Sequence, residues 1–180
     1  MKIILINVSS IDGKITKWTG NDTYEWSSAD DFTHFKKVVA QNNLVVMGSE
    51  TFDSVKDNKK AGLKPEKERL RIILTKNPKK YIKYTVPGQM EFSDESPKKL
   101  ISRLERSGHK QMLLVSGDKV ATSFFKDNLI DELLLTIEPR IFGTGESLVQ
   151  DIKLDIKLKL ISTKKLNARG ALLLIYKILK

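Results

Sequence analysis

The chain has 180 residues, of which 40% are hydrophobic and 30% charged, and it contains no cysteine. These values are ordinary for a globular protein and exclude a disordered chain, a collagen-like repeat and a coiled-coil rod. The absence of cysteine excludes a disulfide scaffold, a thiol nucleophile and a zinc finger. The length and the lack of a linker predict one domain, residues 1–180.

The formal net charge of +10 makes the chain strongly basic. Such a surplus suggests an anionic partner, which could be a nucleic acid, an anionic lipid or a phosphorylated small molecule. The longest apolar run, residues 171–176, is far shorter than the ~20 residues that cross a bilayer. The apolar start of the chain is also too short for a secretion signal. We therefore expect a cytoplasmic protein without a membrane partner.

Hydrophobic periodicity and turn signals predict the following elements in chain order. Strands are expected at residues 2–8, 44–47, 70–75, 112–115, 133–138, 154–160 and 171–179, and helices at residues 28–39, 97–107 and 120–126. The alternation of strands with helices predicts a largely parallel sheet covered on both faces. The last two strands, joined by a turn at 167–170, predict an antiparallel hairpin at one edge. Altogether we expect about eight strands and four helices.

Small and polar residues follow several of the predicted strands, and ligands of such sheets bind beyond the carboxyl ends of the strands. The segments 48–51 and 116–119 each pass from a strand through glycine into a helix. A helix N-terminus offers free N–H groups and a partial positive charge, which suit a phosphate. Neither segment has the P-loop or the GxGxxG pattern. Glycine at such a turn is also common for geometric reasons alone.

Several motifs together resemble the dihydrofolate reductase superfamily: SSIDGKIT, the spacing from Trp26 to Asp31, VVMGSETFDSV, RIILTKNP, LLVSGDKVATSFF and IDELLLTIEP. The closest branch is the stand-alone relatives of the bacterial riboflavin-biosynthesis reductase, the RibD C-terminal domain. The resemblance implies an α/β, dihydrofolate-reductase-like three-layer sandwich. Its sheet would be mixed and mostly parallel, with about eight strands, closed by a C-terminal antiparallel hairpin.

The resemblance also implies an oxidoreductase that transfers a hydride from NADPH, with NADH as the second choice. The substrate would be a pterin or an aminopyrimidine. The enzyme would then act like dihydrofolate reductase or like 5-amino-6-(5-phosphoribosylamino)uracil reductase. Because relatives in this branch are often dimers, a homodimer is expected as well.

The positions that match the cofactor-binding motifs are spread over four strand ends. The backbone at Val8 and Ser9 would face the nicotinamide, and Asp12 and Gly13 would begin a loop that closes over it. The remaining matches would hold the pyrophosphate and the adenosine ribose: Gly48, Ser49, Thr51, Thr75, Lys76, Val115, Ser116, Gly117, Asp118 and Lys119.

The resemblance assigns catalysis to Asp31, with Thr136 as its hydroxyl partner and Trp26 shielding a nearby water. Phe35 and Val55 would wall the substrate pocket. Arg69 would hold the carboxylate of a folate substrate, and Arg71 is the alternative for a phosphorylated pyrimidine. A partly buried carboxylate can accept two hydrogen bonds from an aminopyrimidine edge. Burial raises its pKa, so that it can help to protonate the ring.

Each residue also has an ordinary structural role. Asp31 in the first turn of a helix can be a capping charge, and isolated lysines are usually solvated. His34 and His109 show no metal-ligand spacing, so no metal site is predicted.

Ser49 stands where folate reductases have arginine, and Glu50 follows it. This weakens the case for NADP over NAD unless Lys76 or Lys119 supplies the positive charge.

Two alternatives to an active reductase remain. One is a catalytically degenerate relative that still binds a nucleotide. The other is a basic module of the same fold that binds RNA or another polyanion. Aromatic residues make up only 7% of the chain, which counts against a nucleic-acid partner.

Overall fold

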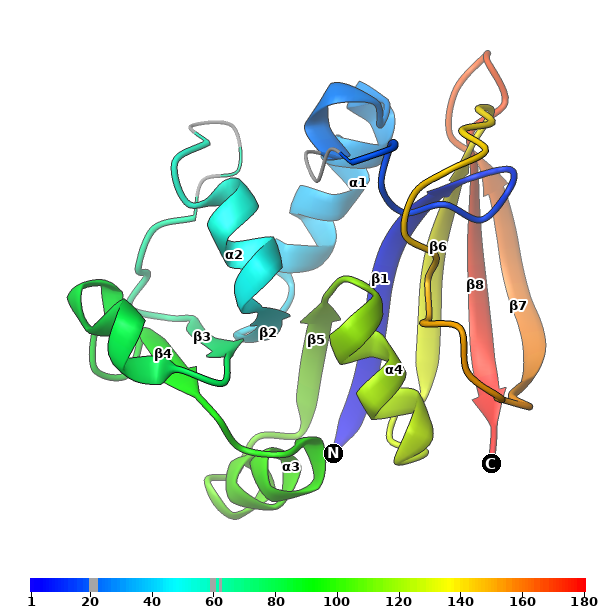
Figure 1. Ribbon diagram of the computed structural model, residues 1–180. Helices are drawn as coiled ribbons and strands as arrows, with labels where there is room; N and C mark the ends of the chain where they lie inside the picture. The colour runs from blue at the N-terminus through cyan, green and yellow to red at the C-terminus, as the bar shows by residue number, and fades with distance from the viewer. Residues whose placement is uncertain (20–22, 59–60, 62) are drawn as a thin grey trace.

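The computed structural model describes the chain except for residues 20–22, 59–60 and 62, and an eight-stranded mixed sheet runs through it (Figure 1). In the order in which they pair, the strands are β4 (Met90–Ser93), β3 (Leu70–Leu74), β2 (Leu44–Gly48), β5 (Gln111–Val115), β1 (Lys2–Ser10), β6 (Glu132–Glu138), β8 (Leu172–Leu179) and β7 (Lys157–Lys165). The first six are mutually parallel, β8 pairs antiparallel with β6, and β7 pairs antiparallel with β8.

Helices cover both faces of the sheet. They are α1 (Ala29–Ala40), α2 (Ser49–Val55), α3 (Pro97–Arg106) and α4 (Asp118–Lys126), with two short 3-10 helices, η1 (Thr23–Glu25) and η2 (Pro78–Tyr84). Successive side chains of a strand point to opposite faces. Accordingly, Ile3 and Leu5 pack in a core with α3 and α4, whereas Ile4 and Ile6 pack in a second core with α1 and α2.

The predicted fold class is confirmed, and the differences in its elements have simple causes. Strand β1 extends through Ser9 and Ser10, which we expected in a loop because they are polar. Both are buried in the structure and pair with Ile137 and Glu138 of β6. Strand β4, only four residues long and at the edge of the sheet, was not predicted.

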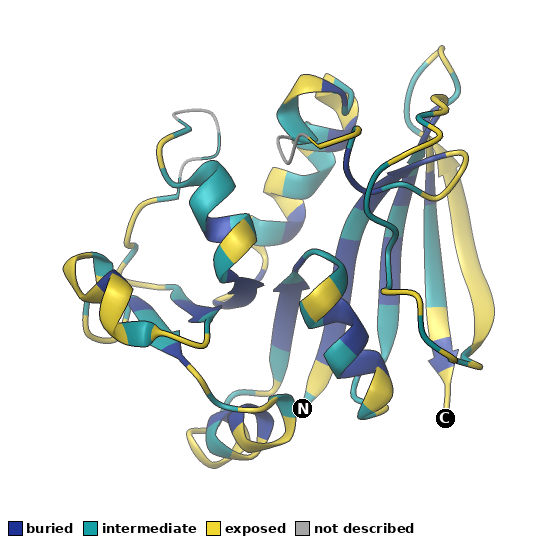
Figure 2. Cartoon of the chain, viewed as in Figure 1, coloured by how far each residue is buried: buried dark blue, intermediate teal, exposed yellow. Residues whose placement is uncertain are grey.

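The prediction of a half-buried strand over residues 154–160 is wrong in both its bounds and its burial. The strand is β7, at Lys157–Lys165, and all nine of its residues are exposed (Figure 2). Leu154 and Ile156 lie before it and pack against a core. The alternation of leucines suggested one covered face, but β7 is an edge strand with a bulge between Leu160 and Ser162. A bulge changes which residues share a face.

Within the described residues, no helix has the length and apolar character needed to cross a membrane.

The segment that follows β1 is hydrogen-bonded to the segment that follows β6. Ile15 N donates to Glu146 O at 2.8 Å, and Glu146 N donates to Thr16 Oγ1 at 2.7 Å. Gly145, next to Glu146, has a φ of +142°, and a Cβ added to it would lie 2.2 Å from Thr16 O. The close contact of the two backbones therefore requires glycine at this position.

We predict that Gly145→Ala destabilises the protein by roughly 2–4 kcal/mol, because it combines an unfavourable φ with a backbone clash. Gly143→Ala is the matched control. Gly143 also has positive φ, at +73°, but an added Cβ meets nothing within 4 Å. It should cost only about 1 kcal/mol. Urea denaturation of the two variants measures the difference, and equal losses would contradict the role of the close contact.

Candidate active site

A cleft of about 1060 Å³ opens at the carboxyl ends of the parallel strands. Most of the residues predicted to bind cofactor or substrate line it. These are Val8, Asp31, Phe35, Gly48, Ser49, Thr51, Val55, Thr75, Lys76, Val115, Ser116, Gly117, Asp118 and Lys119. The structure therefore gathers side chains that are far apart in the sequence into one cavity.

Asp31 lines the cleft from the first turn of α1. Its backbone N–H donates to the Oγ of the N-cap residue Ser28 at 3.2 Å. The hydroxyls of Thr136 and Ser27 hydrogen-bond to its carboxylate. Asp31 thus lies in the first turn of the helix, where an acid has an ordinary stabilising role, and it also lines the cavity.

Burial raises the pKa of Asp31 from its ordinary 3.8 to about 6, and the nearby charge of Glu138 adds to the effect. The hydroxyls of Thr136 and Ser27 act in the opposite direction, because they stabilise the ionised form. A carboxyl group with this pKa exists in both protonation states near neutral pH. It can therefore accept hydrogen bonds or deliver a proton.

Glu138 belongs to this site and was not predicted. It is buried at the end of β6, and its Oε1 accepts from the backbone N–H of Ser28 at 2.8 Å. It therefore holds the start of the helix that carries Asp31. One signal in the sequence could have identified it: Glu138 is two residues after Thr136, so both side chains lie on one face of the strand.

Trp26 and Thr136 lie beside the cleft rather than among the residues that line it. Both are buried, with 2% of each residue exposed. Trp26 packs edge-to-face on Phe142, with ring centroids 5.1 Å apart. The buried Nε1 of Trp26 has no hydrogen-bond partner among the described residues.

Asp12 and Gly13 are also outside the residues that line the cleft. The carboxylate of Asp12 accepts from Ser10 Oγ at 2.6 Å, from Gly143 N at 2.7 Å and from Phe142 N at 3.1 Å. The bond from Ser10 and those from the two backbone N–H groups hold the pKa of Asp12 down, at about 2. Asp12 thus joins the two loops near the cleft. Ser9, likewise outside the lining, is buried within β1.

Arg69 lies outside the cleft, whereas Arg71 lines it. Arg69 precedes β3 and borders a smaller cavity of about 530 Å³ formed by residues that precede β2, β3 and β5. Its Nε donates to Asn42 O at 2.9 Å, and its guanidinium pairs with Glu66. Arg71 is 4% exposed and contacts Glu66 and the carbonyl of Lys64.

The two strand-to-helix turns also line the cleft. Gly48 and Gly117 are the N-cap residues of α2 and α4. A Cβ at Gly48 would lie 3.1 Å from Val120 Cγ2, so glycine allows the two helices to approach. Ser116 is 5% exposed, and its Oγ has no partner among the described residues. A buried hydroxyl of this kind is costly unless a ligand or water satisfies it.

Within the described part of the chain, no group of three or more His, Asp or Glu side chains is arranged to hold a metal ion.

The strand order, the antiparallel edge hairpin and the cleft at the strand ends define a dihydrofolate-reductase-like fold, the fold of a class of oxidoreductases. The family model of the RibD C-terminal domain matches residues 1–172, and the chain belongs to that family. The resemblance inferred from the motifs is thereby confirmed.

One relative is similar to this chain in sequence, and two solved structures are similar to it in fold. The uncharacterised protein YyaP of Bacillus subtilis (strain 168) is 25% identical over 179 residues, which cover 97% of this chain and 94% of that protein. A putative riboflavin biosynthesis protein from Shewanella sp. PV-4 superposes with a TM-score of 0.78 at 20% identity, and both chains are fully covered. The third is a diaminohydroxyphosphoribosylaminopyrimidine deaminase/5-amino-6-(5-phosphoribosylamino)uracil reductase from Thermotoga maritima. It has a TM-score of 0.76 at 18% identity, covering 99% of this chain and 56% of that one.

We predict that Asp31→Asn stabilises the protein at pH 8. The raised pKa means that folding disfavours the ionised carboxylate. This penalty is absent below pH 3.8 and fully present above about pH 6. The gain over wild type should therefore grow from near zero at pH 4 to as much as about 3 kcal/mol at pH 8. Urea denaturation across this range measures it, with the exposed neighbour Asp30→Asn as control. A gain that does not change with pH would refute the raised pKa.

Proposed function

We propose that the protein is an NADPH-dependent reductase that transfers a hydride to a pterin or aminopyrimidine-type substrate. One observation carries this proposal: a single cleft is lined both by a buried carboxylate, Asp31, and by two glycine-containing strand-to-helix turns. Membership of the RibD C-terminal domain family supports it. The cavity slightly exceeds the ~300–1,000 Å³ of ordinary small-molecule sites, as a site for both a cofactor and a substrate requires.

The turns fit a dinucleotide cofactor. The unpartnered Oγ of Ser116 is a free donor in the cleft, and Gly48 and Gly117 leave the starts of two helices accessible. Lys76 and Lys119 are exposed cations on the cleft wall. These residues would hold the pyrophosphate and the ribose phosphate. A nicotinamide cofactor supplies a hydride when it is bound.

In the same cleft, Asp31 would bind the N–C–NH₂ edge of the substrate and provide the proton that balances hydride addition. Its raised pKa permits both tasks. The hydroxyls of Thr136 and Ser27 fix the orientation of the carboxylate. Phe35 and Val55 line the cleft with apolar side chains, which would pack against the ring of the substrate.

Between the two substrate classes, the arginines favour a phosphorylated pyrimidine. Arg69, the residue that would bind the carboxylate of a folate, does not reach the cleft, whereas Arg71 does. Ser49, which replaces the arginine of folate reductases, lies at the cleft as well. The uracil reductase named for the Thermotoga maritima structure has a substrate of this kind.

A degenerate nucleotide-binding relative is the principal alternative, since carboxylates as well as lysines surround the start of α4. A basic module that binds RNA or another polyanion remains a lesser one. The cytoplasmic location also stays a prediction. So does the homodimer, for which the exposed side chains of Leu158, Leu160 and Leu172 on the edge hairpin are the surface we would expect it to use.

We predict that NADPH raises the melting temperature in a thermal-shift titration at fixed salt, and that NADH does so less. A ligand at about 100 times its Kd adds roughly 2.7 kcal/mol of stability, which amounts to several degrees for a chain of this size. A shift with either cofactor supports a cofactor site. No shift with either would refute the reductase proposal and leave the polyanion alternative to be tested.

Asp31→Asn should lower kcat by about 10²-fold or more, because amide cannot donate the proton. NADPH affinity should stay unchanged, since Asp31 belongs to α1 and to neither of the two turns proposed to hold the cofactor. Loss of nicotinamide absorbance with pyrimidine and pterin substrates measures the rate. Asp30→Asn, the exposed neighbour in the same helical turn, is the control. Wild-type turnover by the Asp31 variant would remove the carboxylate from the mechanism.

A further inference from the structure

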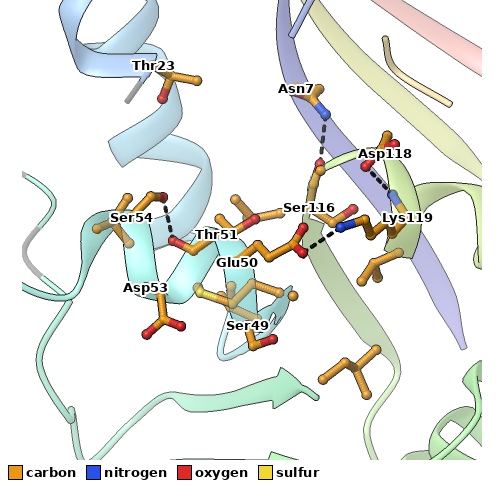
Figure 3. Close-up of a pocket in the computed structure, with 18 of the residues that line it drawn as sticks. Asn7, Thr23, Ser49, Glu50, Thr51, Asp53, Ser54, Ser116, Asp118 and Lys119 are labelled. Atoms are coloured by element: carbon orange, nitrogen blue, oxygen red, sulfur yellow. Dashed lines mark hydrogen bonds and ion pairs between the residues drawn. The ribbon is translucent and has the colours of Figure 1, made fainter. Parts of the chain in front are cut away.

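Three carboxylates and one ammonium group lie around the start of α4, in the same part of the cleft. Glu50 Oε1 reaches from α2 to Lys119 Nζ at 2.5 Å (Figure 3). Asp118 Oδ1 accepts from the backbone N–H of Lys119 at 2.6 Å. Glu146 Oε2 lies 3.9 Å from the position of a Cβ added to Gly117, the N-cap residue. The chain's own carboxylates thus surround a helix start and a lysine that would otherwise attract an anionic ligand.

These groups act on one another electrostatically. The hydrogen bond that Lys119 donates to Glu50 raises the pKa of Lys119. Burial raises the pKa of Glu146, and the charges of Asp118 and Glu50 raise it further. The three carboxylates outnumber the one lysine, so this part of the cleft is locally acidic in a chain whose net charge is +10.

An independent observation indicates that this place is nevertheless built for a ligand. Ser116 lines the cleft two residues before α4 and is 95% buried, and its Oγ has no partner among the described residues. Neither Glu50 nor Glu146 satisfies this hydroxyl. The helix start therefore carries a free donor alongside a lysine that the protein itself neutralises.

We propose that Glu50 is a specificity-determining residue that competes with anionic ligands for Lys119. A diphosphate group would displace the Glu50 carboxylate from Lys119 and would also accept the hydrogen bond of Ser116. This rests on the proposed function in that the diphosphate would be that of the nicotinamide cofactor. Glu50 thereby lowers the affinity for any anionic ligand whose own contact with Lys119 does not make up for the lost Glu50–Lys119 ion pair.

The ion pair is a good target for mutation because both side chains are exposed, 62% for Glu50 and 58% for Lys119. Their substitution should leave the fold intact. The matched control is Asp127→Asn. Asp127 is the C-cap residue of the same helix, outside the cleft, and pairs with Lys98 at 3.1 Å. Like Glu50→Gln, this control removes one negative charge from a carboxylate paired with a lysine, but it does so away from the proposed site.

The experiment compares wild type with Glu50→Gln, Lys119→Met, the double variant and Asp127→Asn. Calorimetric titration with NADPH, NADH and inorganic pyrophosphate gives the affinities. Glu50→Gln should tighten binding about 3- to 10-fold, since it removes a charge that competes at contact distance. Lys119→Met should weaken binding by a similar factor. In the Lys119→Met background, Glu50→Gln should have a smaller effect, because the competition acts through the lysine. Asp127→Asn should bind as wild type does.

Unchanged or weaker binding by Glu50→Gln overturns the proposal, and weaker binding would mean that Glu50 itself contacts the ligand. The two proposals fail in distinguishable ways. NADPH binding that is unaffected by Glu50→Gln supports the reductase and refutes the competition. Pyrophosphate binding that Glu50→Gln tightens, with no binding of either nicotinamide cofactor, supports the competition and refutes the reductase. Binding of no probe by any variant refutes both.

Discussion

The pairing of β1 with β5 on one side and β6 on the other is the constraint on which the cleft depends. Both pairs are parallel, with Ile6 opposite Val115 and Val8 opposite Thr136. Parallel strands end at the same edge of a sheet. The register therefore places the turn after β5, with its free donor Ser116, at the same edge of the sheet as the end of β6, whose Thr136 hydrogen-bonds to Asp31. A shift of one residue in either pair would turn the polar side chains to the opposite face.

Around Asp31, the charged groups are arranged unfavourably for stability. Asp31 and Glu138 are both buried, and each makes hydrogen bonds that fix its position. Burial and proximity disfavour two ionised carboxylates, so the pKa of Asp31 rises. Departures of this kind from the most stable arrangement occur often at active sites, where a group must hold or release a proton near neutral pH. The stability lost here is recovered in the two apolar cores on either side of the sheet.

At the cofactor end, overall charge is a poor guide to the local field. The basic surplus of the chain suggests an anionic partner, yet Glu50, Asp118 and Glu146 gather where the pyrophosphate would bind. Surface lysines far from the cleft are screened by solvent and salt and contribute little to the field inside it. An anion at this place would pair with Lys119, but the Nζ of Lys119 is already paired with the carboxylate of Glu50.

The sequence by itself determined the strand–helix alternation and the edge hairpin, because periodicity and turn residues act locally. Most of the site residues that it predicted line the cleft, and these came from the resemblance to a known family. Only the tertiary structure decided that Arg71 rather than Arg69 reaches the cleft and that Glu138 lies beside Asp31. It also decided that β7 is exposed. Alternation along one strand indicates its two faces but not which neighbours cover them. Burial and charge pairing arise between segments distant in the chain, and a local pattern does not contain them.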